Sequence, residues 1–162
     1  MNVIIRFVAA TLLSLSVPLV FAPLSWAQGL SLTIGNTVAG QDYVVKNPQF
    51  IFRVNGCADL SKAHLSATAE GFTTGARRSI ALEPQALPTQ PGIYAIGDQW
   101  GTDGTWVVAI TATCEGATAG AIVPVNEKSF VRARTQLLSH APSQSDIELA
   151  LKAYATPVSI PQ

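Results

Sequence analysis

Apolar and polar residues alternate along the chain between residues 30 and 125, and turn-forming residues separate the alternating runs. A period of two places every second side chain on the same side of an extended strand, so each run indicates a strand with one buried face. The runs predict buried stripes at Leu30–Leu32–Ile34, Phe50–Phe52–Val54, Leu65–Ala67–Ala69 and Ile80–Leu82. A loop is predicted at residues 84–91, and a last strand, rich in alanine, isoleucine and valine, is predicted at residues 120–125.

The strongest turn signal is Gly-Thr-Asp-Gly at residues 101–104. It follows a run with Tyr94 and Trp100 in phase, and it precedes a long β-branched run. Glycine and aspartate tolerate the positive φ that tight turns require. We therefore predict a β-hairpin that joins a strand at residues 92–100 to a strand at residues 105–114.

The predicted strands follow one another too closely for helices to lie between them. About seven short strands at such spacing favour an antiparallel sandwich over a parallel α/β sheet. We therefore predict an all-β fold: an immunoglobulin-like antiparallel β-sandwich over residues 28–126, followed by a linker and a C-terminal α-helix within residues 127–162.

The segment after residue 126 predicts one amphipathic helix. Ser145, with Glu148 three residues later, has the pattern of a capping box. The apolar residues of the helix lie at i, i+3, i+4 and i+7 and form one stripe, Ile147, Ala150, Leu151 and Tyr154. This stripe can dock on its own sandwich or enter a groove of another protein. Short isolated helices are marginal in water, which favours docking on the sandwich.

Residues 1–27 have the features of a secretory signal sequence. A positive charge precedes an apolar run at residues 7–21, and Ser25-Trp26-Ala27 has the small-x-small pattern of a cleavage site. An uncleaved anchor, the alternative, needs about 20 uninterrupted apolar residues, and Pro18 and Pro23 interrupt this run. We therefore expect a periplasmic or secreted mature chain that is not stably inserted in a membrane.

The chain contains two cysteines, Cys57 and Cys114. In an oxidising compartment such a pair most simply forms one disulfide, and a shared metal site is the alternative. An immunoglobulin-like strand order would bring the two cysteine-bearing strand ends to one pole of the sandwich. The bond would then link the two sheets.

The charge of the chain is balanced, with 10 basic and 10 acidic residues. Removal of residues 1–27 takes away Arg6 and leaves a formal charge of 9 − 10 = −1. A nearly neutral chain without blocks of like charge is not steered strongly toward polyanions, so we expect no nucleic-acid partner.

No residue pattern predicts a reaction. The chain has no Gly-x-Ser-x-Gly nucleophile motif, and Asp98, Asp103 and Glu115 are more typical of soluble turns than of paired catalytic carboxylates. His64 and His140 have no neighbour at metal-ligand spacing. We therefore expect no enzyme, no cofactor and no metal site.

Aromatic and apolar residues are better candidates for binding than polar ones. Trp106 is in phase with the buried positions of its strand, which leaves Trp100, beside the glycine-rich turn, as the exposed aromatic candidate. The predicted partner-binding residues are Trp100, Ile147, Leu151 and Tyr154.

Part of the chain resembles a known group of domains. Pro-Gly-Ile-Tyr at residues 91–94, Trp100, and Gly-Thr-Trp-Val-Val-Ala-Ile at residues 104–110 are similar to the late strands of exported bacterial immunoglobulin-like domains of the YtkA-like and FixH-like group. The resemblance implies an accessory protein of copper handling or oxidase assembly. Soft sulfur and imidazole ligands suit copper, but Met1 is the only methionine and the histidines number two.

The sequence thus predicts a non-catalytic periplasmic accessory or scaffold module that binds an unidentified envelope protein. The alternative is a periplasmic carrier of a small ligand or of a metal such as copper, with His64, His140 and nearby carboxylates as ligands.

Overall fold

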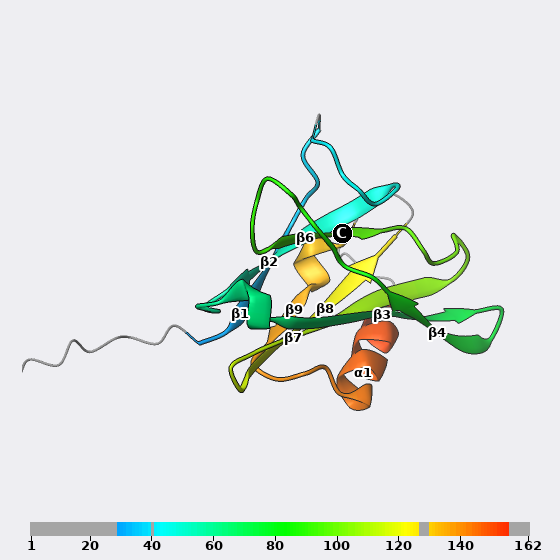
Figure 1. Ribbon diagram of the computed structural model, residues 1–162. Coiled ribbons are helices and arrows are strands. Elements are labelled where there is room, and N and C mark those ends of the chain that lie inside the picture. Colours follow the sequence, from blue (N-terminus) through cyan, green and yellow to red (C-terminus); the bar gives the residue numbers. More distant parts are fainter. Residues whose placement is uncertain (1–28, 40, 127–129, 156–162) are drawn as a thin grey trace, which may run out of the picture.

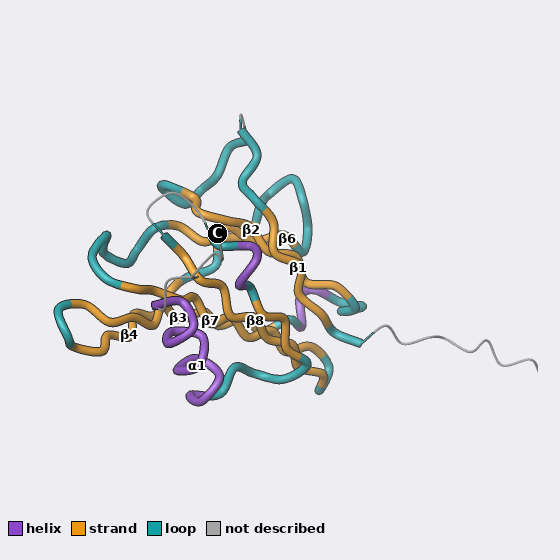
Figure 2. Tube along the Cα trace, turned by 180° about the vertical axis from the view of Figure 1, so that it is seen from behind, coloured by secondary structure: helices purple, strands orange, loops and turns teal. Residues whose placement is uncertain are grey.

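The structure, a computed structural model, describes residues 29–39, 41–126 and 130–155. The signal sequence predicted at residues 1–27 lies outside these residues. Two antiparallel sheets face each other, and one α-helix lies on the outer side of one sheet (Figure 1). The same three layers are visible from behind in Figure 2. The predicted antiparallel sandwich with a C-terminal helix is confirmed.

The strand order of both sheets is that of an immunoglobulin domain. The first sheet has the order β1 (Ser31–Gly35), β2 (Pro48–Asn55), β6 (Ile93–Gly97) and β5 (Gln85–Ala86). The second has the order β4 (Ala76–Leu82), β3 (His64–Thr73), β7 (Thr105–Cys114), β8 (Ala117–Val125) and β9 (Gln136–Leu138). With β1 to β8 lettered A, B, C, C′, D, E, F and G, the first sheet reads A-B-E-D and the second reads C′-C-F-G, with β9 as a further strand beside G. The strands β5 and β9 are the two that alternation did not predict, because each is too short to carry a period.

The alternating stripes of the sequence form the core between the sheets. The inward residues of β1 and β2 are buried, as are Ala67 and Ala69 of β3, and Leu65 is half-buried at the edge of the core. Strand β7 is buried on both faces: Trp106, Val108 and Ile110 face the opposite sheet, whereas Val107 and Ala109 pack with residues of the helix.

The predicted disulfide is confirmed. The Sγ atoms of Cys57 and Cys114 lie 2.05 Å apart. Cys57 follows the end of β2, and Cys114 is the last residue of β7, so the bond links the two sheets at one pole. Both sulfur atoms are used in this bond, which replaces the alternative of a shared metal site.

The predicted hairpin between residues 92–100 and 105–114 is wrong. Strand β6 pairs with β2 and β5, whereas β7 pairs with β3 and β8. The connection between them crosses from one sheet to the other. The turn residues reverse the chain locally, but the partner of each strand is decided by which sheet buries its apolar face. Strand β6 ends at Gly97, where an added side chain would collide with Val45.

The segment that we predicted as a linker contributes to the sandwich. Its 3-10 turn, η2 (Arg132–Arg134), follows the buried Phe130, which packs in the main core. The strand β9 then pairs with β8 at the sheet edge. The chain passes from β9 across Gly120, where an added side chain would meet the carbonyl of His140 and the ring of Pro142.

The helix α1 (Gln144–Ala155) begins two residues earlier than the predicted cap at Ser145 indicated. Its cap is Ser143, not Ser145: the Ser143 amide donates to Asp146 Oδ2 (2.9 Å), and the Asp146 amide donates to Ser143 Oγ (3.2 Å). The reason is tertiary. The close contact at Gly120 places residues 140–142 against β8, and Glu148 is instead bound to an arginine of the sheet.

The apolar stripe of α1 docks on the protein's own sandwich. Ile147, Ala150 and Leu151 pack against residues of β7 and β8, namely Val107, Ala109 and Ile122. A second, polar contact lies beside this cluster. Arg77 of β4 reaches Glu148 Oε1 of the helix through Nη1 (3.1 Å) and Glu70 Oε2 of β3 through Nη2 (3.4 Å). The helix is therefore held by both apolar burial and a bridging guanidinium.

Candidate functional site

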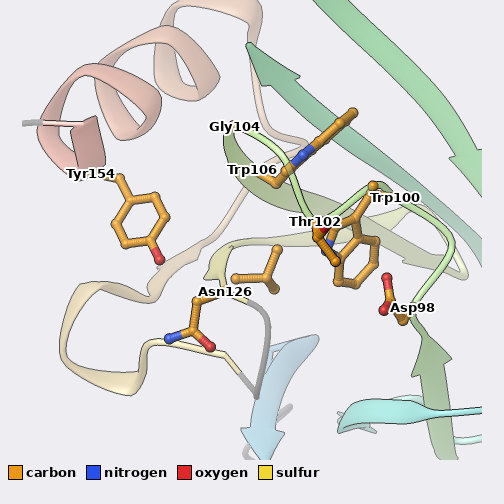
Figure 3. A pocket seen from close by; sticks show the side chains of 9 residues that line it. Asp98, Trp100, Thr102, Gly104, Trp106, Asn126 and Tyr154 are labelled. Carbon is orange, nitrogen blue, oxygen red and sulfur yellow. The ribbon is translucent and has the colours of Figure 1, made fainter. Parts of the chain in front are cut away.

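An aromatic cleft of about 350 Å³ lies between the β6–β7 connection, the end of β8 and the last turn of α1 (Figure 3). Its lining residues are Asp98, Trp100, Gly101, Thr102, Gly104, Trp106, Val125, Asn126 and Tyr154. Ligand pockets combine apolar and aromatic walls with a few polar groups. The cleft has both kinds of lining: three aromatic side chains and Val125 lie beside the polar side chains of Asp98, Thr102 and Asn126. We refer to it below as the aromatic cleft.

Trp106 forms a fixed wall of the aromatic cleft. It is 3% exposed, as its phase in the strand predicted, and its indole Nε1 donates to the Asp103 carbonyl (2.9 Å). The ring lies directly over Gly71 of β3, where any Cβ would collide with it. Gly104 is a second required glycine: its φ is +96°, and a Cβ there would meet the Phe72 carbonyl. The absence of side chains at Gly71 and Gly104 therefore leaves the space in which the Trp106 indole and the loop that accepts its hydrogen bond are packed.

Trp100 is not the exposed residue that the sequence predicted. It is 7% exposed and belongs to the main core, with part of its ring lining the aromatic cleft. The correction follows from the topology. Because β6 and β7 lie in different sheets, the connection between them passes over the end of the sandwich. The indole of Trp100, which belongs to this connection, fills space between the sheets.

Tyr154 closes the aromatic cleft from the side of the helix. Arg134 lies beside its ring, with Cζ 5.5 Å from the ring centroid, and donates through Nη1 to the carbonyls of Ala153 (2.9 Å) and Tyr154 (3.1 Å). These carbonyls belong to the last helical turn, which has no intrahelical donors for them. Arg134 therefore fixes the helix end, and with it the position of the Tyr154 ring.

The structure separates the four predicted partner-binding residues into two pairs. Trp100 and Tyr154, far apart in sequence, line the same cleft. Ile147 and Leu151 are 6% and 1% exposed and face the outer side of the second sheet. They are not available to a partner while the helix is docked, because the sheet already covers their side chains.

The polar groups of the aromatic cleft come from loop residues that sequence reasoning did not select for binding. We assigned Asp98 to a soluble turn, and Thr102 and Asn126 carried no signal. The Asp98 amide donates to the Asn47 carbonyl (3.1 Å), but within the described residues its carboxylate has no hydrogen bond or ion pair. The neighbouring Asp103 carboxylate accepts a long bond from the Thr102 hydroxyl (3.4 Å). Asp98 thus contributes to the lining a carboxylate for which the described part of the chain supplies neither a hydrogen bond nor a counter-ion.

Within the described residues, two carboxyl groups have lowered pKa values, and both take part in hydrogen bonds at the N-terminal end of a helical segment. Hydrogen bonds from the Ser61 hydroxyl and amide lower the pKa of Asp59, which caps the 3-10 turn η1 (Leu60–Lys62). The hydroxyl and amide of Ser143 likewise lower the pKa of Asp146. Hydrogen bonds to the charged form favour that form, so these shifts reflect capping.

The described residues contain no group of three or more histidine, cysteine, aspartate or glutamate side chains that could hold a metal ion. His64 and His140 are both exposed, and His140 Nδ1 lies 2.9 Å from the Ala141 carbonyl. The metal-carrier alternative therefore has no assembled ligand set in the part of the chain that the structure describes.

Comparisons with known proteins give no relative. No protein-family model matches the chain, and no curated protein or solved structure matches it. The resemblance to the YtkA-like and FixH-like group therefore stays a prediction. In residues 29–39, 41–126 and 130–155, no helix is long and apolar enough to cross a membrane.

Proposed function

We propose that this chain is an exported, non-catalytic binding module that holds an envelope protein through the aromatic cleft. The observation that carries this proposal is the convergence of Trp100, Trp106 and Tyr154 on one concave site. Tryptophan and tyrosine are enriched among residues that dominate binding energy, because they provide large, rigid surfaces with a polar end.

Two further features support the proposal. The disulfide between Cys57 and Cys114 is typical of an oxidising compartment outside the cytoplasm. The signal-sequence features of residues 1–27 point to the same location. The anchoring of the cleft walls by Arg134 and by the Trp106 hydrogen bond supports binding to a preformed site. Preformed sites bind with a smaller loss of conformational entropy.

Site-specific photocrosslinking in the native envelope tests this proposal. Thr102→benzoylphenylalanine places the reactive ketone at the aromatic cleft. The same change at Leu149, which is 64% exposed on α1, is the matched control. We expect one discrete protein adduct from position 102 that disappears when Tyr154→Leu is added. Equal adducts from both positions, or none from position 102, would overturn the proposal and leave a small-ligand carrier as the second candidate.

A further inference from the structure

We propose that the aromatic cleft recognises a positively charged side chain, an arginine or a lysine, of the bound partner. This inference rests on the proposed function for the identity of the partner as a protein. It concerns the chemistry of the group that enters the cleft, whose lining includes the three aromatic residues and Asp98 (Figure 3).

The first argument is the number and type of aromatic rings. Two indoles and one phenol from three separate elements line a single cleft. The face of an aromatic ring is electrostatically negative, and a cation within about 6 Å of its centroid is attracted to it, most strongly by tryptophan. The protein already uses this attraction at the same tyrosine, where Arg134 lies 5.5 Å from the Tyr154 centroid.

The second argument is charge. Among the described residues, the lining includes one carboxylate, Asp98, and neither lysine nor arginine. Arg134 is engaged by two carbonyls at the helix end, whereas the Asp98 carboxylate has no partner among the described residues. A carboxylate that faces an aromatic cleft without a counter-ion is complementary to a cation from outside.

The third argument is size. A cleft of about 350 Å³ is at the lower end of the range for ligand pockets, about 300–1,000 Å³. That volume admits one long side chain and excludes a strand or a helix. Arginine and lysine suit it because their alkyl stems pack on apolar walls such as Val125 while the charged end stays near polar groups.

The experiment compares two probes that differ in charge and hardly at all in shape, N-acetylarginine amide and N-acetylcitrulline amide. Binding is followed by tryptophan emission in the full chain with Trp26→Phe. The tryptophans that remain, Trp100 and Trp106, both line the aromatic cleft. A single side chain without its protein context should bind weakly, with a Kd on the order of 1 mM. We expect the citrulline probe to bind at least about fivefold more weakly, because it lacks the charge.

Matched variants identify the groups responsible. Asp98→Asn should weaken arginine binding about fivefold and leave citrulline binding unchanged. Asp103→Asn removes a carboxylate of the same loop that does not line the cleft, so it should have little effect. Tyr154→Leu should weaken binding about threefold to tenfold, whereas Tyr154→Phe, which retains the ring, should preserve it.

Several results would overturn the inference. One is equal affinity for the two probes, and another is an equal effect of Asp98→Asn and Asp103→Asn. A third is the lack of a saturable emission change up to about 50 mM probe, a concentration far above the expected Kd. Tighter binding of tetramethylammonium than of arginine amide would also overturn it, in favour of a small quaternary ligand. If the probe experiments give one of these results while position 102 still gives a Tyr154-dependent adduct, the binding function stands and only the cationic ligand is rejected. Loss of that adduct rejects the binding function itself.

Discussion

Leu151→Ala tests whether α1 is an integral part of the fold. Leu151 is 1% exposed and packs with Val107 and Ile122 of the second sheet. Leu149, two positions away on the same helix, is 64% exposed. Truncation of both residues to alanine therefore makes the same chemical change on the buried and on the exposed face of one helix.

The magnitude follows from the atoms removed. Leucine to alanine deletes three carbon atoms, and at about 0.8 kcal/mol per buried methylene the transfer loss is about 2.4 kcal/mol. The cavity that remains adds to this, so we expect Leu151→Ala to lower the free energy of unfolding by about 3 kcal/mol. Leu149 retains roughly a third of this burial, which limits the loss for Leu149→Ala to about 1 kcal/mol, offset in part by the higher helix propensity of alanine.

Urea unfolding followed by circular dichroism measures both losses, and amide exchange within residues 144–155 shows whether the helix itself is released. If Leu151→Ala frees the helix without unfolding the sandwich, the measured loss stops at the docking energy of α1, and exchange in the helix becomes fast while the sheets stay protected. Equal, small effects of the two variants on both measurements would refute the docked helix.

Two further predictions concern the disulfide and the helix cap. Because the bond spans a sequence separation of 57, the chain-entropy model predicts that Cys57→Ala with Cys114→Ala costs about 4 kcal/mol of unfolding free energy; a loss below about 1 kcal/mol by urea titration would contradict it. Ser143 hydrogen bonds lower the pKa of Asp146 below 3.8, so their stabilisation is complete above pH 3.8 and is lost as the pH falls through the lowered pKa. Ser143→Ala should raise this pKa in a carboxyl NMR titration, and an unchanged value would show that the capping bond is absent in solution.

Much of the fold was predictable because the burial of one face of a long strand requires apolar and polar residues to alternate in the local sequence. The alternation at β1, β2, β3 and β7 identified their inward residues, since a strand between water and a core must alternate. The cysteine pair was predictable for a similar reason: two cysteines in an oxidising setting have few alternatives. The stripe of α1 was visible in the sequence because the side of the helix that packs on the sheet must be apolar, and three members of the stripe are buried there.

The aromatic cleft was only partly predictable. Trp100 was selected as an exposed aromatic residue and Tyr154 as a member of the helix stripe, and their common location was not foreseen. Nothing in the local sequence of Asp98, Thr102 or Asn126 indicates that they share a site. Their proximity depends on where the β6–β7 connection, β8 and α1 end relative to one another.

By itself, the sequence determined which residues are apolar at strand or helix spacing, and therefore the longer strands, the terminal helix and the disulfide. These features depend on neighbours within a few residues, or on two unique side chains. Only the tertiary structure decided that β6 and β7 pair in different sheets, that Ser143 caps the helix, and that Trp100 is buried while it lines a cleft. Strand pairing and site assembly depend on competition among surfaces distant in sequence, and no local pattern records the outcome of that competition.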